Sequence, residues 1–303
     1  MTAALGRQQV AVRPTGAALG ADIAGVDLAG ELPPETVAAI KQAWAVHLVL
    51  RFRGQRLGDD DLLRFSRHFG ELDYAPVYAA QTEAPGQSRQ VEVVEAGRRY
   101  VMVVSNVIED GKAIGDLGAY EALWHTDMSY VAAPPSASAL YALEVPPSGG
   151  DTGFCNMYAA FETLPDELRR QIEGRVCRHD ASRNSAGQLR RGYADMPDPS
   201  QTVGVDHPLV RTHPVTGRPA LFLGRRRNAY IPGLDLAGSE ALLDRLWAHA
   251  TRPEFAWYQQ WRVGDLVLWD NRCVMHRRDA FDPETRRVMH RTQIKGDQPL
   301  RAG

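Results

Sequence analysis

The sequence predicts a mainly β protein with flanking helices, built on a double-sheet barrel or jelly roll. Short apolar runs separated by turn residues recur along the chain, whereas only a few segments have helical spacing. The sequence contains no internal repeat, and no stretch has the composition of a linker. We therefore expect one domain over residues 1–303.

Four segments carry the spacing and the end signals of helices. Two prolines open the first, which places Val37, Ile40 and Trp44 at helical intervals. Acidic residues fill the first turn of the second, Gly70 follows its last turn, and Pro253 ends the fourth. The expected helices lie in residues 32–47, 58–70, 158–174 and 238–253.

Short runs with β character lie between these helices. The apolar run from Leu48 to Phe52 predicts a strand directly after the first helix. Residues 209–224 predict a hairpin that turns at Pro214 to Gly217, and residues 261–276 predict a turn followed by a buried strand. Residues from about 80 to 122 are polar and rich in glycine, and we expect an irregular segment of the kind that forms a lid or binding loop.

Composition limits the classes of protein and partner. The chain is 44% hydrophobic and 24% charged, which is enough apolar material for a sizeable core. A formal net charge of −2 argues against a nucleic-acid partner, and we interpret the basic run 225–227 as a solvated loop. Three scattered cysteines indicate a reducing compartment. Without a secretion signal or a long apolar stretch, we expect a cytoplasmic protein that does not span a membrane.

The segment ALWHTDMSY carries the first chemical signal. His125 and Asp127 alternate on an expected strand, and a period of two puts both side chains on one face. An imidazole and a carboxylate that converge in this way can ligate a divalent metal. Taken alone, however, the spacing favours chance or a hydrogen-bonded pair in the core.

A third candidate ligand strengthens the prediction of a metal site. His68 and His249 end helices, where the helix dipole favours a cation, and His207 and His213 precede prolines in expected turns. His276 instead ends the buried strand. Two histidines and one carboxylate form the facial triad of non-haem ferrous oxygenases, and the same three ligands could also hold zinc in a hydrolase.

Residues near these candidate ligands could support them. Asp270 and Asn271 are candidates for orienting His276. Arg287 and Arg291 would share one face of a strand, and a guanidinium recognises a carboxylate through paired hydrogen bonds. Either arginine alone is better explained by a surface ion pair.

Longer motifs then point to a family. LWHTDMSY, PPSGGDTGFCNMYAAFETLP, HPLVRTHPVTGRPALFL, HATRPEFAWYQQWRVGDLVLWDNRCVMH and RRVMHRTQIKGD occur in this order. Together they resemble the taurine dioxygenase family of iron(II)/2-oxoglutarate-dependent oxygenases, which includes the 2,4-dichlorophenoxyacetate dioxygenases. The resemblance runs from about residue 10 to residue 298. It implies a jelly roll that uses Fe(II), 2-oxoglutarate and O2 and releases succinate and CO2.

The resemblance also assigns roles to six side chains. His125, Asp127 and His276 match the iron ligands, and the retained aspartate argues against a halogenase. Thr152 matches a threonine that hydrogen-bonds 2-oxoglutarate, and Arg287 matches the arginine that binds its distal carboxylate. Arg291 matches a second active-site arginine, which in the taurine enzyme faces the anionic group of the substrate, and we expect it to contribute to the cosubstrate site as well.

The substrate is expected to be a small organic anion. The segment after Phe69-Gly70 lacks the histidine that contacts sulfonate in taurine enzymes, whereas residues 103–127 resemble the phenoxyacetate dioxygenases. We therefore expect oxidation of an aryloxyalkanoate-type acid, with O-dealkylation as one outcome, and sulfonate or alkyl sulfate oxidation as the alternative. The expected pocket residues are Tyr78, Asn106, Met128, Tyr130 and Arg291.

Three further expectations complete the hypothesis. A zinc hydrolase would give Thr152 and the two arginines no shared purpose, so it is the remote alternative. A jelly roll that binds its ligand without turnover is the non-enzymatic alternative. The resemblance implies a homo-oligomer, either a dimer or a tetramer.

Overall fold

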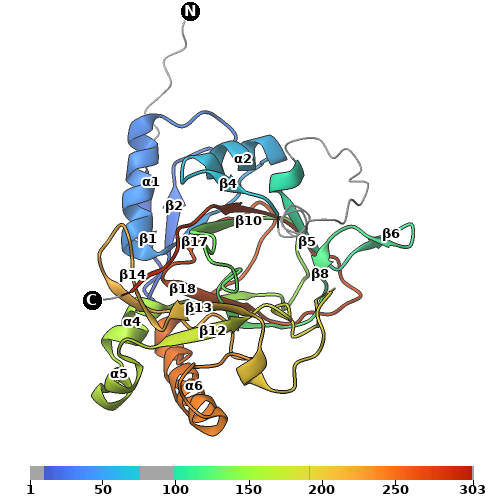
Figure 1. Ribbon diagram of the computed structural model, residues 1–303. Coiled ribbons are helices and arrows are strands. Elements are labelled where there is room, and N and C mark those ends of the chain that lie inside the picture. The colour runs from blue at the N-terminus through green and yellow to red at the C-terminus, as the bar shows by residue number, and fades with distance from the viewer. Residues whose placement is uncertain (1–9, 76–97, 191, 302–303) are drawn as a thin grey trace, which may run out of the picture.

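Two β-sheets that face each other form the body of the molecule (Figure 1). The computed structural model describes residues 10–75, 98–190 and 192–301. Within these residues, the larger sheet has nine strands and the smaller has four. The expectation of a mainly β, jelly-roll core with flanking helices is confirmed.

The larger sheet runs in the order β1-β2-β3-β17-β10-β19-β5-β8, and β4 also pairs with β19. Only two of its pairings, β2 with β3 and β5 with β8, are parallel. Its strands are β1 (Ala11–Pro14), β2 (Ala21–Ala24), β3 (Val49–Phe52), β4 (Leu72–Asp73), β5 (Met102–Ser105), β8 (Asp116–Leu117), β10 (Ala137–Glu144), β17 (Leu266–Asp270) and β19 (Val288–Ile294).

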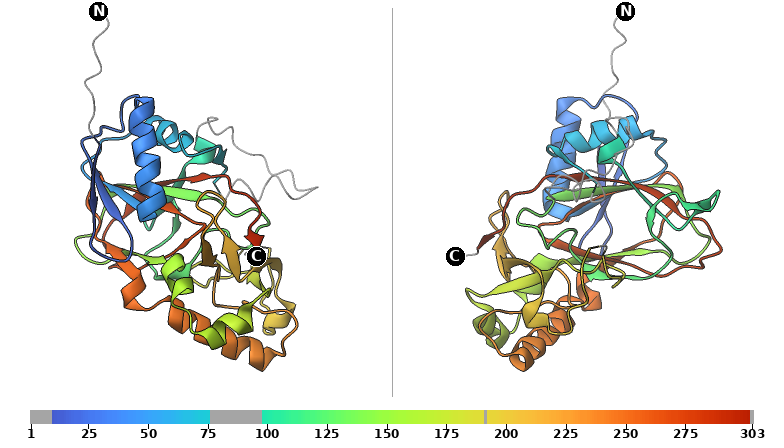
Figure 2. Two further views of the ribbon diagram at one scale, coloured as in Figure 1. Left: turned by 90° about the vertical axis from the view of Figure 1, so that its left-hand side faces the viewer. Right: turned by 45° about the vertical axis from the view of Figure 1, so that its right-hand side comes forward.

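Both faces of this sheet are covered, which explains its continuous apolar strands. Ala139 and Tyr141 of β10 pack with α1 and α2 in one buried cluster, and Figure 2 shows these helices above the sheet. Leu140 and Ala142 face the other way, into the space between the sheets. Because side chains alternate along a strand, both sets must be apolar except where the site requires otherwise.

The smaller sheet sets the position of the site. Its order is β16 (Ala256–Gln259), β11 (Thr152–Asn156), β18 (Val274–Arg278) and β9 (Ala122–His125). Phe154, His276 and His125 lie opposite one another on neighbouring strands, and Thr152 lies opposite Arg278 two residues further along. Two imidazoles are therefore brought side by side by strand register.

The helices follow the expected start and stop signals, with one exception. They are α1 (Pro34–His47), α2 (Asp59–Arg67), α4 (Met157–Glu162), α5 (Asp166–Ile172) and α6 (Leu236–Ala250). The single helix expected over residues 158–174 is wrong, because the chain leaves helical geometry between Thr163 and Pro165 and starts again at Asp166. Proline suits a helix start but has no N–H to continue one.

Short strands and 3-10 turns make up the remaining regular structure. These are β6 (Ile108–Glu109), β7 (Lys112–Ala113), β12 (Val176–Asp180), β13 (Gly204–Pro208), β14 (Val210–Thr212), β15 (Pro219–Leu221), β20 (Leu300–Arg301), η1 (Arg98–Tyr100), η2 (Pro199–Gln201) and η3 (Pro253–Phe255). β14 and β15 confirm the expected hairpin.

Two local expectations need correction. The stretch from 80 to 122 is not simply irregular, because its described part contributes β5 and β8 to the larger sheet. His207 does not lie in a turn either: it is a buried residue of β13, paired in register with Cys177. The proline that follows His207 ends the strand and does not prevent it.

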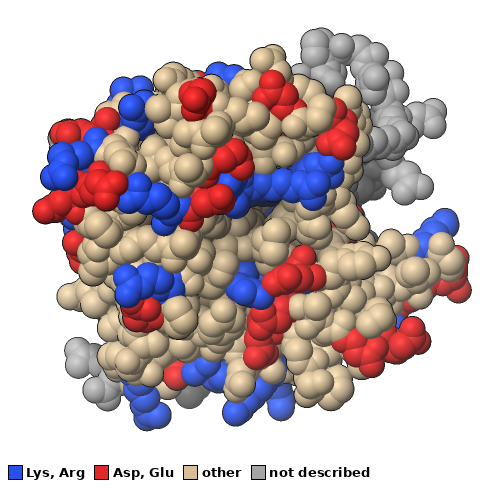
Figure 3. All heavy atoms as spheres, turned by 90° about the horizontal axis from the view of Figure 1, so that it is seen from below, with Lys and Arg blue, Asp and Glu red and all other residues tan. Residues whose placement is uncertain are grey.

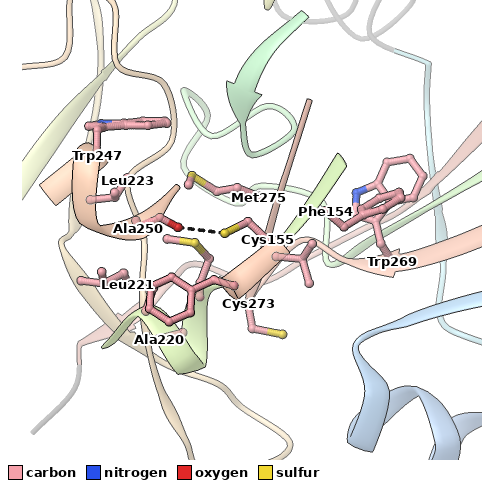
Figure 4. Packing of buried hydrophobic residues seen from close by; sticks show 14 of the residues in the cluster. Phe154, Cys155, Ala220, Leu221, Leu223, Trp247, Ala250, Trp269, Cys273 and Met275 are labelled. Atoms are coloured by element: carbon pink, nitrogen blue, oxygen red, sulfur yellow. Dashed lines mark hydrogen bonds between the residues drawn. The ribbon is translucent and has the colours of Figure 1, made fainter. Parts of the chain in front are cut away.

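The main core lies between the smaller sheet, the helices α4 and α6, and the inner face of the larger sheet. Figure 4 shows Phe154 beside Trp269 and the thiol of Cys155 directed at the Ala250 carbonyl. All three cysteines are buried and unbridged. None of the helices in the described part of the chain has the length and apolarity needed to cross a bilayer.

Candidate metal centre

Three buried side chains meet between the two sheets. Nε2 of His125 lies 3.9 Å from Oδ1 of Asp127, and Nε2 of His276 lies 3.8 Å from the same oxygen. Two atoms that each lie ~2.1 Å from a shared ion can be at most ~4.2 Å apart. Both separations therefore fit one divalent cation, and the three residue types fit the facial triad.

Asp127 reaches this point by a different route from the one expected. β9 ends at His125, so the two residues do not alternate along one strand. Asp127 and Met128 belong to a turn in which Met128 takes a φ of +43°. The N–H of Thr126 donates to the Gly224 carbonyl, which anchors the start of this turn. The spacing was informative, but the strand interpretation behind it is wrong.

The protonation of both imidazoles suits metal binding. Nδ1 of His125 donates to the carbonyl of Leu123 at 2.6 Å, which leaves the lone pair on Nε2 for an ion. Burial holds the pKa of His125 well below its usual range and lowers the pKa of His276 to about 4. Both rings are therefore neutral near pH 7.

The prediction that Asp270 or Asn271 orients His276 is wrong. Asn271 instead supports the carboxylate of Asp127. Asp270 binds Arg272 and His213. Asn271 donates to Ser138 Oγ at 3.0 Å, and Ser138 donates to Asp127 Oδ2 at 2.8 Å. This chain of hydrogen bonds fixes the orientation of the Asp127 carboxylate.

Arg291 binds the other oxygen of that carboxylate. Its Nη1 donates to Oδ1 of Asp127 at 3.0 Å. Burial alone would raise the pKa of Asp127, but the Arg291 guanidinium and the neighbouring imidazoles outweigh it and hold the pKa well below its usual range. The candidate metal ligand is therefore ionised, as coordination requires.

A cavity of about 560 Å³ adjoins the three candidate ligands. Arg287 lines it and is 2% exposed, and none of its three guanidinium nitrogens has a partner among the residues that the structure describes. Burial lowers the pKa of Arg287 to about 9, so the group is still charged at pH 7. A buried charge without a partner is costly, and this one is poised to receive an anion.

Thr152 lines the same cavity at the start of β11. Its Oγ1 accepts a hydrogen bond from Trp261 Nε1 at 2.9 Å, which leaves the hydroxyl proton available for a ligand. Gly150 precedes it with a φ of +67°, and a Cβ there would lie 3.4 Å from Arg287 Nε. Glycine at this position therefore accommodates both the backbone turn and the approach of the guanidinium.

The expected substrate residues fall into three groups. Met128 and Tyr130 line the cavity. The amide of Asn106 donates to the carbonyls of Pro283 and Thr285 and accepts from the N–H of Arg287, so it holds the backbone before β19. Tyr78 lies outside the described residues.

Two arginines of the cavity lie far in sequence from the predicted site and were missed. Arg190 and Arg225 both line the cavity, and the interpretation of residue 225 as part of a solvated loop is wrong. Arg225 forms an isolated bridge with His125, at the open edge of the smaller sheet. The signal that could have placed Arg225 in the cavity is its position directly after the buried run Leu221 to Gly224.

A jelly roll with two neutral imidazoles and one carboxylate beside an unpaired buried arginine defines a metal-dependent oxygenase. The family model "Taurine catabolism dioxygenase TauD, TfdA family" matches residues 11–293, and the chain belongs to this family. It is an oxidoreductase, an Fe(II)- and 2-oxoglutarate-dependent dioxygenase that uses O2, as expected from the sequence motifs. The hydrolase and non-enzymatic alternatives are not supported.

Individual relatives cover nearly the whole chain. An alpha-ketoglutarate-dependent 2,4-dichlorophenoxyacetate dioxygenase from Cupriavidus pinatubonensis is 36% identical over 95% of this chain and 98% of its own length. An alpha-ketoglutarate-dependent sulfate ester dioxygenase from Pseudomonas putida is 32% identical over 95% and 90%. The crystal structure of AAD-2 in complex with Mn(II) and N-oxalylglycine has a TM-score of 0.74 and 30% identity, covering 96% of this chain and 99% of that one.

Proposed function

We propose that this dioxygenase oxidises a small organic anion, with aryloxyalkanoates as the preferred class. The observation that carries the proposal is the charge of the cavity, where five of the described arginines face only two described aspartates, Asp116 and Asp127. The charges of Fe(II) and 2-oxoglutarate cancel, so an excess of three positive charges remains for the substrate. The arginines are Arg190, Arg225, Arg278, Arg287 and Arg291.

This positive charge is a local feature. The whole chain has a formal net charge of −2, and basic and acidic side chains are interspersed on the face in Figure 3. Inside a cavity of low dielectric, the same charges act more strongly than they do at the surface. The local excess of arginine therefore favours an anion in the cavity, although the chain as a whole has a slight negative charge.

His125, Asp127 and His276 are the proposed iron ligands. Bound there, Fe(II) supplies the activation of O2 that is coupled to decarboxylation of 2-oxoglutarate. The protein keeps both imidazoles neutral and the carboxylate ionised and aligned. Arg291 serves Asp127 in this proposal, because its Nη1 already donates to that carboxylate, although the family resemblance had placed it against the substrate anion.

Arg287 and Thr152 are the proposed partners of the distal carboxylate of 2-oxoglutarate. A guanidinium can donate two parallel hydrogen bonds to a carboxylate, and the Arg287 guanidinium donates to no group among the described residues. The Thr152 hydroxyl can donate a third. This corner of the cavity also contains Arg278, whose guanidinium lies 5.5 Å from the centroid of the Phe281 ring, and Arg287 lies 5.9 Å from the same centroid.

Apolar side chains suit the body of the substrate. Met102, Val104 and Leu140 come from the larger sheet, and Leu189 comes from the loop that covers the cavity. Such a wall accepts an aromatic or alkyl group. With an aryloxyacetate, hydroxylation of the carbon beside the ether oxygen gives a hemiacetal, which breaks down to a phenol and glyoxylate.

A substrate panel tests the proposal. The iron-loaded protein is incubated with 2-oxoglutarate and with 2,4-dichlorophenoxyacetate, 2-phenoxypropionate, hexyl sulfate or taurine, and succinate formation and O2 uptake are measured. We expect the aryloxy acids to give the largest stimulation, with release of the corresponding phenol. Stimulation by taurine alone contradicts the proposal.

Alkyl sulfates are the second candidate class. The Pseudomonas putida relative is named a sulfate ester dioxygenase, and a sulfate group offers the same acceptors to a guanidinium as a carboxylate does. Stimulation by hexyl sulfate above that by the aryloxy acids identifies this class. In that case the inorganic sulfate released equals the succinate formed.

Three further expectations belong to the proposal. We infer that residues 1–303 act as one domain, that the chain forms a homodimer or homotetramer, and that it works in the cytoplasm. The family match over residues 11–293 supports the first, and the three unbridged cysteines support the last. Sedimentation of the full chain measures the second.

A further inference from the structure

A second pair of cationic side chains lies in the cavity beside Tyr130. The guanidinium carbons of Arg190 and Arg225 are 4.4 Å and 5.2 Å from the centroid of the Tyr130 ring. Neither forms an ion pair with a carboxylate in the described part of the chain. Two like charges held on one ring repel each other, and an anion placed between them removes that repulsion.

Both guanidiniums have donors left over. Nη1 of Arg225 donates to the carbonyl of Arg183, whereas its Nε is buried and has no partner in the parts of the chain that the structure describes. Nη1 of Arg190 donates to the carbonyl of Ala181 at 3.2 Å. One hydrogen bond to a backbone carbonyl fixes each side chain and does not neutralise it. The positive charge remains available to a ligand.

The backbone that carries Arg190 is held in place by its own hydrogen bonds. Oδ1 of Asn184 accepts from the N–H groups of Ala186 and Gln188, and the N–H of Arg190 donates to Ser182. Tyr130 belongs to the turn that carries Asp127. The pair is therefore organised before a ligand arrives, which reduces the entropy lost on binding.

The pair lies on the far side of the metal centre from Thr152. Arg225 bridges His125 on β9, His125 pairs with His276 on β18, and β18 pairs with β11, which begins at Thr152. Two strands thus separate Arg225 from Thr152. Arg287 lies on the Thr152 side, because a Cβ on Gly150, two residues before Thr152, would lie 3.4 Å from Arg287 Nε. Two anions can then bind on opposite sides of one ion.

We propose that Arg190 and Arg225, supported by Tyr130, form the subsite that binds the anionic group of the substrate. The group is a carboxylate or a sulfate, which two guanidiniums recognise through charge-assisted hydrogen bonds. This proposal rests on the proposed function, namely oxidation of a small organic anion. In this proposal Arg291 binds the Asp127 carboxylate and Arg287 binds the cosubstrate, so neither of them recognises the anionic group of the substrate.

Binding measurements test the subsite without relying on turnover. Protein loaded with Mn(II) and N-oxalylglycine is titrated calorimetrically with 2,4-dichlorophenoxyacetate and, in a second arm, with hexyl sulfate. Arg190→Gln and Arg225→Gln should each weaken binding of the favoured anion at least about tenfold, because each removes one charge-assisted contact. Affinity for N-oxalylglycine should stay within about twofold of wild type, because its proposed contacts are elsewhere.

Two controls make the result specific. Arg226→Gln changes the neighbouring arginine, whose guanidinium pairs with Glu240 and Asp244 outside the cavity, and should bind both anions like wild type. The neutral 2,4-dichlorophenoxyethanol should bind wild type and the Arg190→Gln variant equally weakly. If Arg225→Gln does not fold, Arg190→Gln carries the test, since it loses one backbone contact only.

The outcomes separate the two proposals. Wild-type protein that binds none of the anions of either class overturns the proposed function and the subsite with it. An anion that binds wild type and both cavity variants with the same affinity overturns the subsite alone. A selective loss of anion affinity, with N-oxalylglycine affinity retained, supports the subsite, and the stronger arm identifies its ligand as carboxylate or sulfate.

Discussion

Two buried clusters in the described residues have nearly the same ingredients but different chemistry. His125, Asp127 and His276 form one, and His213, Asp270 and Cys273 form the other. In both, the potential ligand atoms lie within 4.8 Å of one another. Residue type and proximity alone would make each a metal site.

The hydrogen bonds of the imidazoles distinguish the clusters. In the second cluster, Nδ1 of His213 accepts from the N–H groups of Val215 and Thr216. Its Nε2 must then carry the proton and donate to Asp270 at 3.1 Å. In the first, Nδ1 of His125 is the donor and Nε2 is left with a lone pair. The partner of one ring nitrogen decides what the other can do.

The remaining members of the second cluster are equally committed. Asp270 accepts two side-chain hydrogen bonds from Arg272, at 2.6 Å and 2.8 Å. Burial and the neighbouring Asp270 hold the pKa of the Cys273 thiol well above its usual range, so the thiolate that a metal needs is not formed. We therefore interpret this cluster as structural.

Substituting the aspartate of each cluster in turn is the most direct test of the difference between them. Asp127→Ala should abolish succinate formation and weaken Mn(II) binding by more than about 100-fold, because it removes a charged ligand. Asp270→Asn should still bind one Mn(II) per chain. Titration followed by electron paramagnetic resonance measures both. A stoichiometric ion in Asp127→Ala, lost in Asp270→Asn, reverses the assignment.

The second expected effect concerns stability. Asp270→Asn leaves the charge of Arg272 uncompensated in a buried site and should lower the free energy of unfolding by roughly 3–5 kcal/mol. Urea unfolding at pH 7 measures this value. Arg226→Gln is the matched control, since it breaks partly exposed pairs that contribute little. A value for Asp270→Asn no larger than the control contradicts a structural role.

Arg287 differs from Arg272, which pairs with Asp270, in that its buried charge has no partner among the described residues. Arg287→Gln should raise the KM for 2-oxoglutarate by about 10- to 150-fold, which corresponds to the loss of a charge-assisted contact. At saturating cosubstrate, kcat should change much less. Arg286→Gln is the control, because Arg286 is exposed and pairs with Glu144 and Glu109. Equal KM values in the two variants disprove the assigned role.

The smallest expected effect concerns a third kind of buried histidine, one that packs against aromatic rings. His179 lies against His207 and Phe222, and burial lowers its pKa to about 3. An unfolded histidine titrates near ~6.5, so its neutral form favours folding above that pH, and this stability is lost as the pH falls toward 3. His179→Phe should therefore lose less stability between pH 7 and pH 4.5. Identical pH profiles by urea unfolding contradict this.

The sequence predicted the residue types of the site better than their geometry. The structure brings His125, Asp127 and His276 together as the motifs indicated, although Asp127 lies in a turn after β9. The turn at Met128 was not found, since a positive φ at methionine has no signature in composition. Arg190 and Arg225 were missed because both lie against Tyr130, which is distant in sequence from each of them.

The unpartnered guanidinium of Arg287 has a consequence for the lifetime of the protein in the cell. An anion that binds there stabilises the folded chain and has no comparable site on the unfolded one. If the keto acid binds Arg287 as proposed, the fraction of chains open to proteolysis falls as its concentration rises.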